Sequence, residues 1–172
     1  MGKLLIMAAV LVPAAYAVNG VELSYHGETP EWMFSAGQCR GTWFDIQDFQ
    51  PGATEFTVEW AEIWLFSYPS GTCLELWNGG MSGPAELVTS AELTDGMVWL
   101  PDPVVMEGQF WCLVTSGEPI QILADGEADG HSFYSDDWLI WEQFDLGEFF
   151  ISVGNESEEL SQHSWAALKT AF

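Results

Sequence analysis

The chain has 172 residues, of which 26 are Asp or Glu and only 3 are Lys or Arg, giving a formal net charge of −23 at pH 7. Nucleic acids and anionic membranes bind proteins through clustered Lys and Arg, so this balance argues against both as partners. A hydrophobic content of 48% and an aromatic content of 15% supply enough apolar material for a core, which argues against disorder.

The N-terminus has the three parts of a secretory signal peptide. Lys3 gives a basic start, residues 4–12 are apolar, and Ala15 and Ala17 are small residues at a typical cleavage site. The apolar run is too short to cross a bilayer, and no later segment stays apolar that long, so we expect no membrane span in the mature chain. The sequence predicts a secreted or cell-envelope protein, cleaved after residue 17, in which residues 18–158 form one domain.

The next segments have the pattern of an all-β protein. Short runs rich in aromatic and β-branched residues alternate with turn residues such as Gly, Pro, Asp and Ser. In residues 56–60 apolar and polar side chains alternate, which suits an antiparallel sheet with one face in water. The expected strands are 21–25, 42–49, 55–66, 72–77, 97–100, 109–115, 120–123, 138–141 and 148–153.

Three cysteines, Cys39, Cys73 and Cys112, lie in a chain that we expect to be exported, where disulfides persist. Cys73 and Cys112 both lie in strand-like runs, so we predict that these two form a disulfide and leave one thiol over. The alternative, that all three are small buried apolar residues, stays open.

Residues 125–130, Asp-Gly-Glu-Ala-Asp-Gly, place acids at alternate positions before a glycine. Asp136 is the twelfth residue counted from Asp125, so the segment partly matches a calcium-binding loop. Calcium prefers hard oxygen ligands, and Asp125, Glu127, Asp129 and Asp136 are the ligands that this pattern predicts. The alternative is an acidic hairpin turn that holds no metal.

The sequence holds more Trp than one core usually needs, and sugar-binding β-sandwiches stack sugar rings on exposed indoles. Trp138 and Trp141 are separated by an odd number of residues, so in a regular strand they face opposite sides and one of them is partly exposed. We predict Trp138, Trp141 and Trp77 as ligand-binding residues, with burial in the core as the alternative.

The last residues, 159–172, are expected to form a tail with a short helix. Ser164 can cap the helix, and Trp165, Leu168 and Phe172 fall on one helical face. Because so short a helix is unstable alone in water, this face is expected either to pack on the sandwich or to be recognised by an envelope component.

Five short sequence segments occur in an order found in a known group of domains: residues 42–52, 108–111, 131–137, 148–153 and 164–169. Together they resemble the jelly-roll-like β-sandwich modules of uncharacterised bacterial secreted and cell-envelope proteins. The resemblance covers most of the mature chain and implies an antiparallel two-sheet β-sandwich and export. It implies no activity and no functional residue.

Patterns for catalysis are weak. His26, His131 and His163 lack the spacing of a metal site, and no Gly-x-Ser-x-Gly nucleophile motif is present. We therefore predict a binding or cell-surface assembly module without catalytic activity, with a glycan or an envelope protein as partner. The alternative is a carbohydrate-binding module assisted by calcium, and a glycoside-active enzyme comes third.

Overall fold

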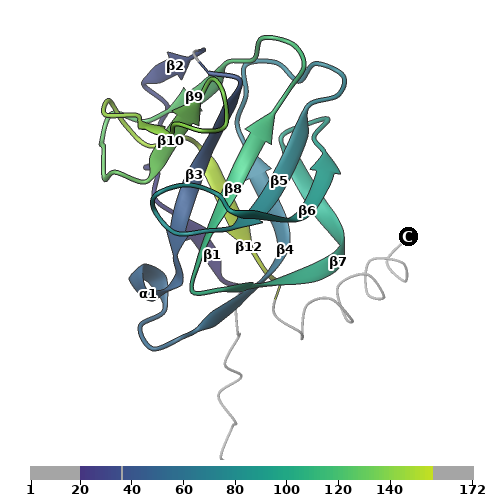
Figure 1. Cartoon of the computed structure of the whole chain (residues 1–172), viewed down its shortest axis with the longest axis vertical. Helices are drawn as coiled ribbons and strands as arrows, with labels where there is room; N and C mark the ends of the chain where they lie inside the picture. Colours follow the sequence, from purple (N-terminus) through teal and green to yellow (C-terminus); the bar gives the residue numbers. More distant parts are fainter. Residues whose placement is uncertain (1–19, 36, 157–172) are drawn as a thin grey trace, which may run out of the picture. The chain divides into compact units, whose positions relative to one another are not determined.

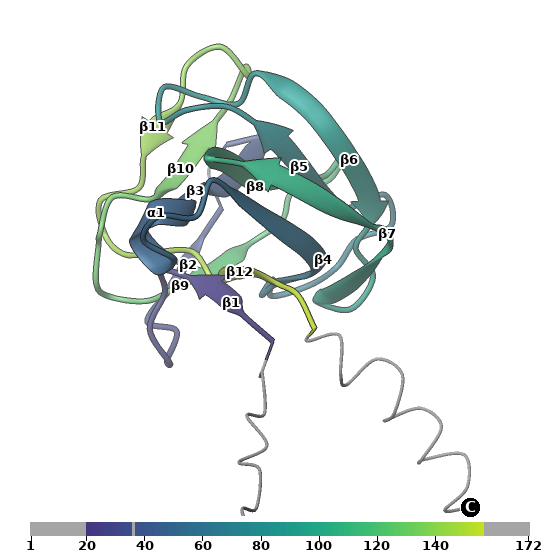
Figure 2. The same cartoon turned by 90° about the horizontal axis from the view of Figure 1, so that it is seen from below.

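The structure, a computed structural model, describes residues 20–35 and 37–156 as a β-sandwich of two antiparallel sheets (Figures 1 and 2). The predicted signal peptide and the predicted C-terminal helix lie outside the described residues. The first sheet has the strand order β1 (Glu22–Ser24), β12 (Ile151–Gly154), β4 (Glu55–Ile63) and β7 (Met97–Glu107).

The second sheet has six strands and begins with two short ones, β11 (Glu142–Gln143) and β10 (Ser132–Ser135). Next to them lie β3 (Cys39–Asp45), β8 (Gln109–Thr115), β5 (Cys73–Asn78) and the edge strand β6 (Glu86–Glu92). A separate ribbon pairs β2 (Trp32–Phe34) with β9 (Ile122–Ala124), and α1 (Ile46–Phe49) is a single short helix.

The connectivity is that of a jelly roll. Setting aside β2, β9, β10 and β11, the strands pair from the outside inwards along the chain: β1 with β12, β3 with β8, β4 with β7, and β5 with β6. Successive strands alternate between the two sheets except for the β5–β6 hairpin, as two nested Greek keys require. The predicted all-β class is confirmed.

The core lies between the two sheets and follows from the alternation of side chains along each strand. Leu74 and Leu76 of β5 and Phe44 of β3 point inwards and are fully buried, whereas the residues between them point to the outer face. Most of the inward side chains are aliphatic or Phe, which pack without polar atoms to satisfy.

Two predicted strands have other structures. The segment from Ile46 to Phe49, expected as strand, is α1, because the carboxylate of Asp45 accepts the N–H of Gln47 and caps a helical turn. Residues 138–141, also expected as strand, form part of the loop between β10 and β11. There Trp138 has a φ of 65°, a left-handed conformation that ends any regular strand.

The cysteines do not pair as predicted. Cys39, Cys73 and Cys112 are all free thiols in the structure. Cys112 belongs to the core between the sheets, whereas Cys73 alternates with the inward Leu74 and so lies on the opposite face of the six-stranded sheet. Side chains on opposite faces of a sheet cannot be joined, and burial raises the pKa of the Cys112 thiol.

Candidate functional site

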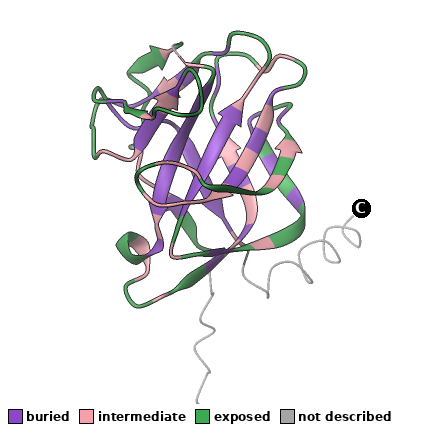
Figure 3. Cartoon of the chain, viewed as in Figure 1, coloured by how far each residue is buried: buried purple, intermediate pink, exposed green. Residues whose placement is uncertain are grey.

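A second apolar cluster lies on the outer face of the six-stranded sheet, separate from the core. Its buried members are Cys39, Trp43, Trp111, Leu113 and Phe133, and the partly buried Trp77 and Trp141 pack against them. Figure 3 shows that β3 and β8, in the middle of this sheet, are almost wholly buried. Both faces of these strands are therefore covered, whereas a two-layer sandwich ordinarily leaves the outer face in water.

Two loops cover this outer face. In the loop between β5 and β6, the Gly80 carbonyl accepts a hydrogen bond of 3.0 Å from Nε1 of Trp111. Gly83 of the same loop lies against Trp141 of the loop between β10 and β11. A Cβ atom on Gly83 would be 3.0 Å from Cδ1 of that indole, and its φ of 143° also favours glycine. The two loops thus meet over the cluster.

The three tryptophans predicted to bind ligand come together at this place. The ring centroids of Trp77 and Trp138 are 5.6 Å apart, and those of Trp138 and Trp141 are 6.0 Å apart at an interplanar angle of 83°. Trp141 continues the contact inwards to Trp111 at 5.1 Å. We call Trp77, Trp138 and Trp141 the tryptophan surface. The sequence argument that Trp138 and Trp141 face opposite sides was wrong, because they lie in a loop.

Hydrogen bonds fix the backbone that presents Trp138. The Ser135 hydroxyl accepts the N–H of Trp138 at 3.0 Å and donates to the Ile140 carbonyl at 2.7 Å. One carboxylate oxygen of Asp137 accepts the N–H groups of Leu139 and Ile140, and these bonds hold the pKa of Asp137 below its usual value. A bulky residue with positive φ is strained, so these four bonds stabilise a conformation that the chain alone disfavours.

The tryptophan surface has apolar and polar neighbours. On the same loop Leu139 is 84% exposed and Ile140 65% exposed, and Met81 and Leu87 add exposed apolar area from the β5–β6 hairpin. Polar groups lie on the other side, where Glu75 accepts a hydrogen bond of 2.8 Å from Nε1 of Trp77. Consecutive large apolar side chains in water are the mark of a contact surface.

The predicted calcium ligands lie in different surroundings. Asp125 is buried, and its carboxylate accepts three backbone N–H groups, those of Gly27, Glu127 and Glu148, at 2.5–3.0 Å. Glu127 and Asp129 are exposed on the same loop, beside a pocket of about 160 Å³ that Asp125, Glu127, Glu28 and Glu31 help to line. Asp125 thus has a structural role in anchoring three segments.

Asp136 lies apart from the other three predicted ligands. It follows β10, whose four residues span about 13 Å, while Asp129 precedes that strand. Within the described residues, no group of three or more acidic, His or Cys side chains has the geometry to hold a metal ion. The four acids are therefore not gathered at one point, and calcium binding stays a prediction.

Glu148, which the sequence did not single out, is fully buried beside the same loop. One carboxylate oxygen accepts the N–H groups of Asp129, Gly130 and His131 at 2.6–3.1 Å, and the other accepts the Ser132 hydroxyl at 2.6 Å. These four bonds satisfy a buried charge and fix the entry to β10. No sequence motif marks this carboxylate, because three of its four partners are backbone N–H groups.

Comparisons with protein-family models, with curated proteins and with solved structures gave no match. Within the described residues, no helix is both long and apolar enough to cross a membrane. The assignment of function therefore rests on the chemistry of the surface described above.

Proposed function

We propose that this chain is a binding module without catalytic activity, and that the tryptophan surface is where it contacts its ligand. The single observation that carries the proposal is the strained, hydrogen-bonded loop that holds Trp138 against Trp77 and Trp141 at the surface. Strain of this kind is retained where the surrounding structure over-determines it, and it clusters at ligand-binding sites.

A glycan is the first ligand class that this surface suits. Sugars present flat apolar faces to indole rings and hydroxyl groups to neighbouring polar atoms. The carboxylate of Glu75 lies next to the ring of Trp77 and can accept a hydrogen bond from a sugar hydroxyl. A neutral glycan also avoids the repulsion that a strongly acidic chain exerts on anions.

An envelope protein is the second candidate, and a different observation favours it. Leu139 and Ile140 are the most exposed side chains beside Trp138, and neither can stack on a sugar or donate a hydrogen bond to one. Protein interfaces, in contrast, place aromatic and aliphatic anchors at their centre. The predicted export of the chain would bring it to such a partner.

Two variants separate the candidates. We expect Trp138→Ala to abolish binding on a glycan array, whereas the double variant Leu139→Ser, Ile140→Ser keeps it, because only the indole stacks on a sugar. If the partner is a protein, both variants lose attachment to the cells that express the chain, since each removes apolar contact area. Cell-surface retention and the array are therefore measured on the same pair of proteins.

A matched control shows that any loss is local. Trp99 of β7 is 52% exposed on the outer face of the other sheet, against 38% for Trp138, so Trp99→Ala removes a more accessible indole from a different sheet. This variant is expected to bind as the parent does. Binding that survives Trp138→Ala but fails in Trp99→Ala would overturn the proposal and move the site to the four-stranded sheet.

A further inference from the structure

Arg40 is the only Lys or Arg among the described residues, and it is buried. It lies on β3 in alternation with Cys39 and Trp43, which belong to the outer cluster, so its side chain points to the interior side of the sheet with Phe44. Only 2% of its surface is exposed. A buried charge ordinarily needs a paired opposite charge, because removal from water is costly.

Among residues 20–35 and 37–156 the guanidinium has no such pair. Nη2 donates a hydrogen bond of 2.7 Å to the carbonyl of Ser35, and Nε has no hydrogen-bond partner within the described part of the chain. Burial lowers the pKa of Arg40 from its ordinary value, and the charge of Asp136 opposes this shift without a hydrogen bond. A guanidinium has five N–H donors, so this group has one donor without a partner at Nε and one bound to Ser35 at Nη2.

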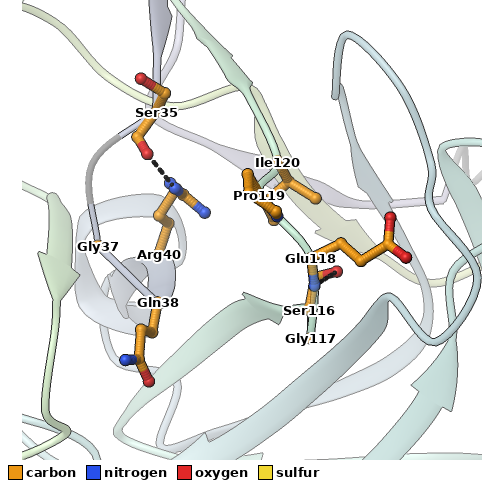
Figure 4. A pocket seen from close by; sticks show the side chains of 9 residues that line it. All are labelled: Ser35, Gly37, Gln38, Arg40, Ser116, Gly117, Glu118, Pro119 and Ile120. Atoms are coloured by element: carbon orange, nitrogen blue, oxygen red, sulfur yellow. Dashed lines mark hydrogen bonds between the residues drawn. The ribbon is translucent and has the colours of Figure 1, made fainter.

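Arg40 lines a pocket. The pocket has a volume of about 440 Å³ and lies between the β2–β3 connection, the start of β3 and the β8–β9 connection (Figure 4). Pro119 and Ile120 lie on the side opposite the guanidinium, and the carboxylate of Glu118 points away from it. Gln38 and Ser116 supply polar groups at the rim, so the wall combines one cation, amides, a hydroxyl and an apolar side.

We propose that this pocket binds a carboxylate group of a ligand, with Arg40 as the residue that pairs with it. A carboxylate has two oxygens in a plane, which match two parallel N–H groups of a guanidinium. The group can belong to an acidic sugar or to the C-terminus of a peptide, since the chemistry at Arg40 is the same. The inference does not depend on the tryptophan surface.

The charge of the chain selects for a single negative charge on the ligand. With a net charge of −23, the protein repels every anion, and the repulsion doubles for a phosphate with two charges. Inside the pocket the one cation can neutralise one carboxylate and no more. A monocarboxylate is therefore expected to bind more tightly than phosphate, which is the reverse of the order at the multi-cation sites that ordinarily bind phosphate.

Arg40 offers a direct measurement because it is the only arginine in the sequence. Protein labelled with ¹⁵N-arginine has one Nε–Hε signal, which is followed by NMR while sodium acetate, sodium glucuronate or an acetylated dipeptide with a free C-terminus is added at constant ionic strength. We expect a saturable shift of this signal, with dissociation constants on the order of 0.1–10 mM for such small ligands. The relative affinities of glucuronate and the dipeptide distinguish the two sources.

Control compounds and a control variant show whether the shift of the Arg40 signal requires a carboxylate. Methyl glucuronate ester, acetamide and sodium chloride lack the free carboxylate and are expected to leave the signal unmoved. Glu118→Gln should bind acetate at least as tightly as the parent does, because it removes a negative charge from the pocket wall and leaves Arg40 in place. A shift of equal size with chloride, no shift with any carboxylate, or tighter binding of phosphate would each overturn the proposal.

Removal of the arginine gives a second, independent readout. Arg40→Met keeps the apolar part of the side chain and removes the buried charge, so the free protein should be as stable as the parent or more stable. Acetate or glucuronate should raise the melting temperature of the parent and leave that of Arg40→Met unchanged, because only the parent gains binding energy on folding. An equal rise in both proteins would contradict the proposal.

Discussion

The two apolar clusters of this protein lie on opposite faces of one sheet and are built from different residues. Between the sheets, aliphatic side chains and Phe predominate, and most strands contribute by alternation. On the outer face, Trp predominates and two loops complete the cluster, with part of it exposed. The first arrangement suits stability alone. The second combines packing with side chains that remain available to a partner.

The sharpest test of this difference uses two neighbours on β5. Leu76 points into the core and is fully buried, while Trp77 points outwards and is half-buried. We expect Leu76→Ala to lower the free energy of unfolding by about 3–4 kcal/mol, because it leaves a cavity in the core. Trp77→Ala should lower it by only about 1–2 kcal/mol. Urea denaturation followed by far-UV circular dichroism measures both values.

The two variants should affect ligand binding in the reverse order. Trp77→Ala is expected to weaken binding to the ligand of the tryptophan surface, whereas Leu76→Ala leaves the affinity of the folded fraction unchanged. If Leu76→Ala proved the milder change for stability, the outer cluster rather than the interior would be the main source of stability, and the distinction between the two regions would fail.

The strained backbone at Trp138 leads us to expect a stability difference of intermediate size between two variants. With a φ of 65°, alanine keeps the unfavourable left-handed backbone, whereas glycine adopts it freely. Trp138→Gly should therefore be more stable than Trp138→Ala by about 1 kcal/mol, although glycine usually destabilises. Thermal or urea unfolding of the two variants measures the difference, and the opposite order would show that the loop is not held in this conformation.

Calcium should change the stability less than these substitutions do. It tests the acidic loop of residues 125–130 and not the tryptophan surface. If Glu127 and Asp129 contribute to a site, millimolar Ca²⁺ raises the melting temperature, and the double variant Glu127→Gln, Asp129→Asn removes this rise. These two exposed acids are preferred to Asp125, whose carboxylate anchors backbone groups. An equal rise in the variant, or with Mg²⁺, would indicate screening of the acidic surface instead.

The smallest expected effect is the titration of Asp137. Its pKa in the folded protein is depressed by hydrogen bonds from the N–H groups of Ile140 and Leu139, so these bonds add stability above the unfolded pKa and lose it as pH falls through the folded one. The amide NMR signals of Leu139 and Ile140 should therefore titrate only below the ordinary value of 3.8. Asp137→Asn is the control that lacks this titration, and a midpoint between pH 4 and 6 would contradict the assignment.

Sequence patterns predicted the strands of the sandwich better than its loops. Strand 109–115 was predicted with the bounds that β8 has, because its apolar and aromatic residues form an unbroken run. The edge strand β6 was missed, since its mostly exposed residues, Glu-Leu-Val-Thr-Ser-Ala-Glu, have no buried face to mark them. Residues 138–141 look like a strand by composition, but local hydrogen bonds fix them as a loop. Ser135 and Asp137, which precede the segment, accept the N–H groups of three of its residues.

The residues of the candidate sites also differ in how far the sequence could predict them. Trp77, Trp138 and Trp141 could be selected from the sequence because it holds more Trp than one core usually needs. Their meeting at one place depends on pairing between strands far apart in the chain and could not be read from spacing. Arg40 and Glu148 carried no motif at all, since what distinguishes them is burial and the presence or absence of partners in space.

The nested pairing of strands also sets the order in which the protein can fold. Leu23 of β1 pairs with Val153 of β12, so the first sheet closes only when segments about 130 residues apart have met. The hairpin of β5 and β6 is local and can form early, while each surrounding pair must enclose the one within it. Such non-local topologies fold slowly. In its sheet β1 pairs with β12 alone, so β1 stays without a partner strand until β12 has joined.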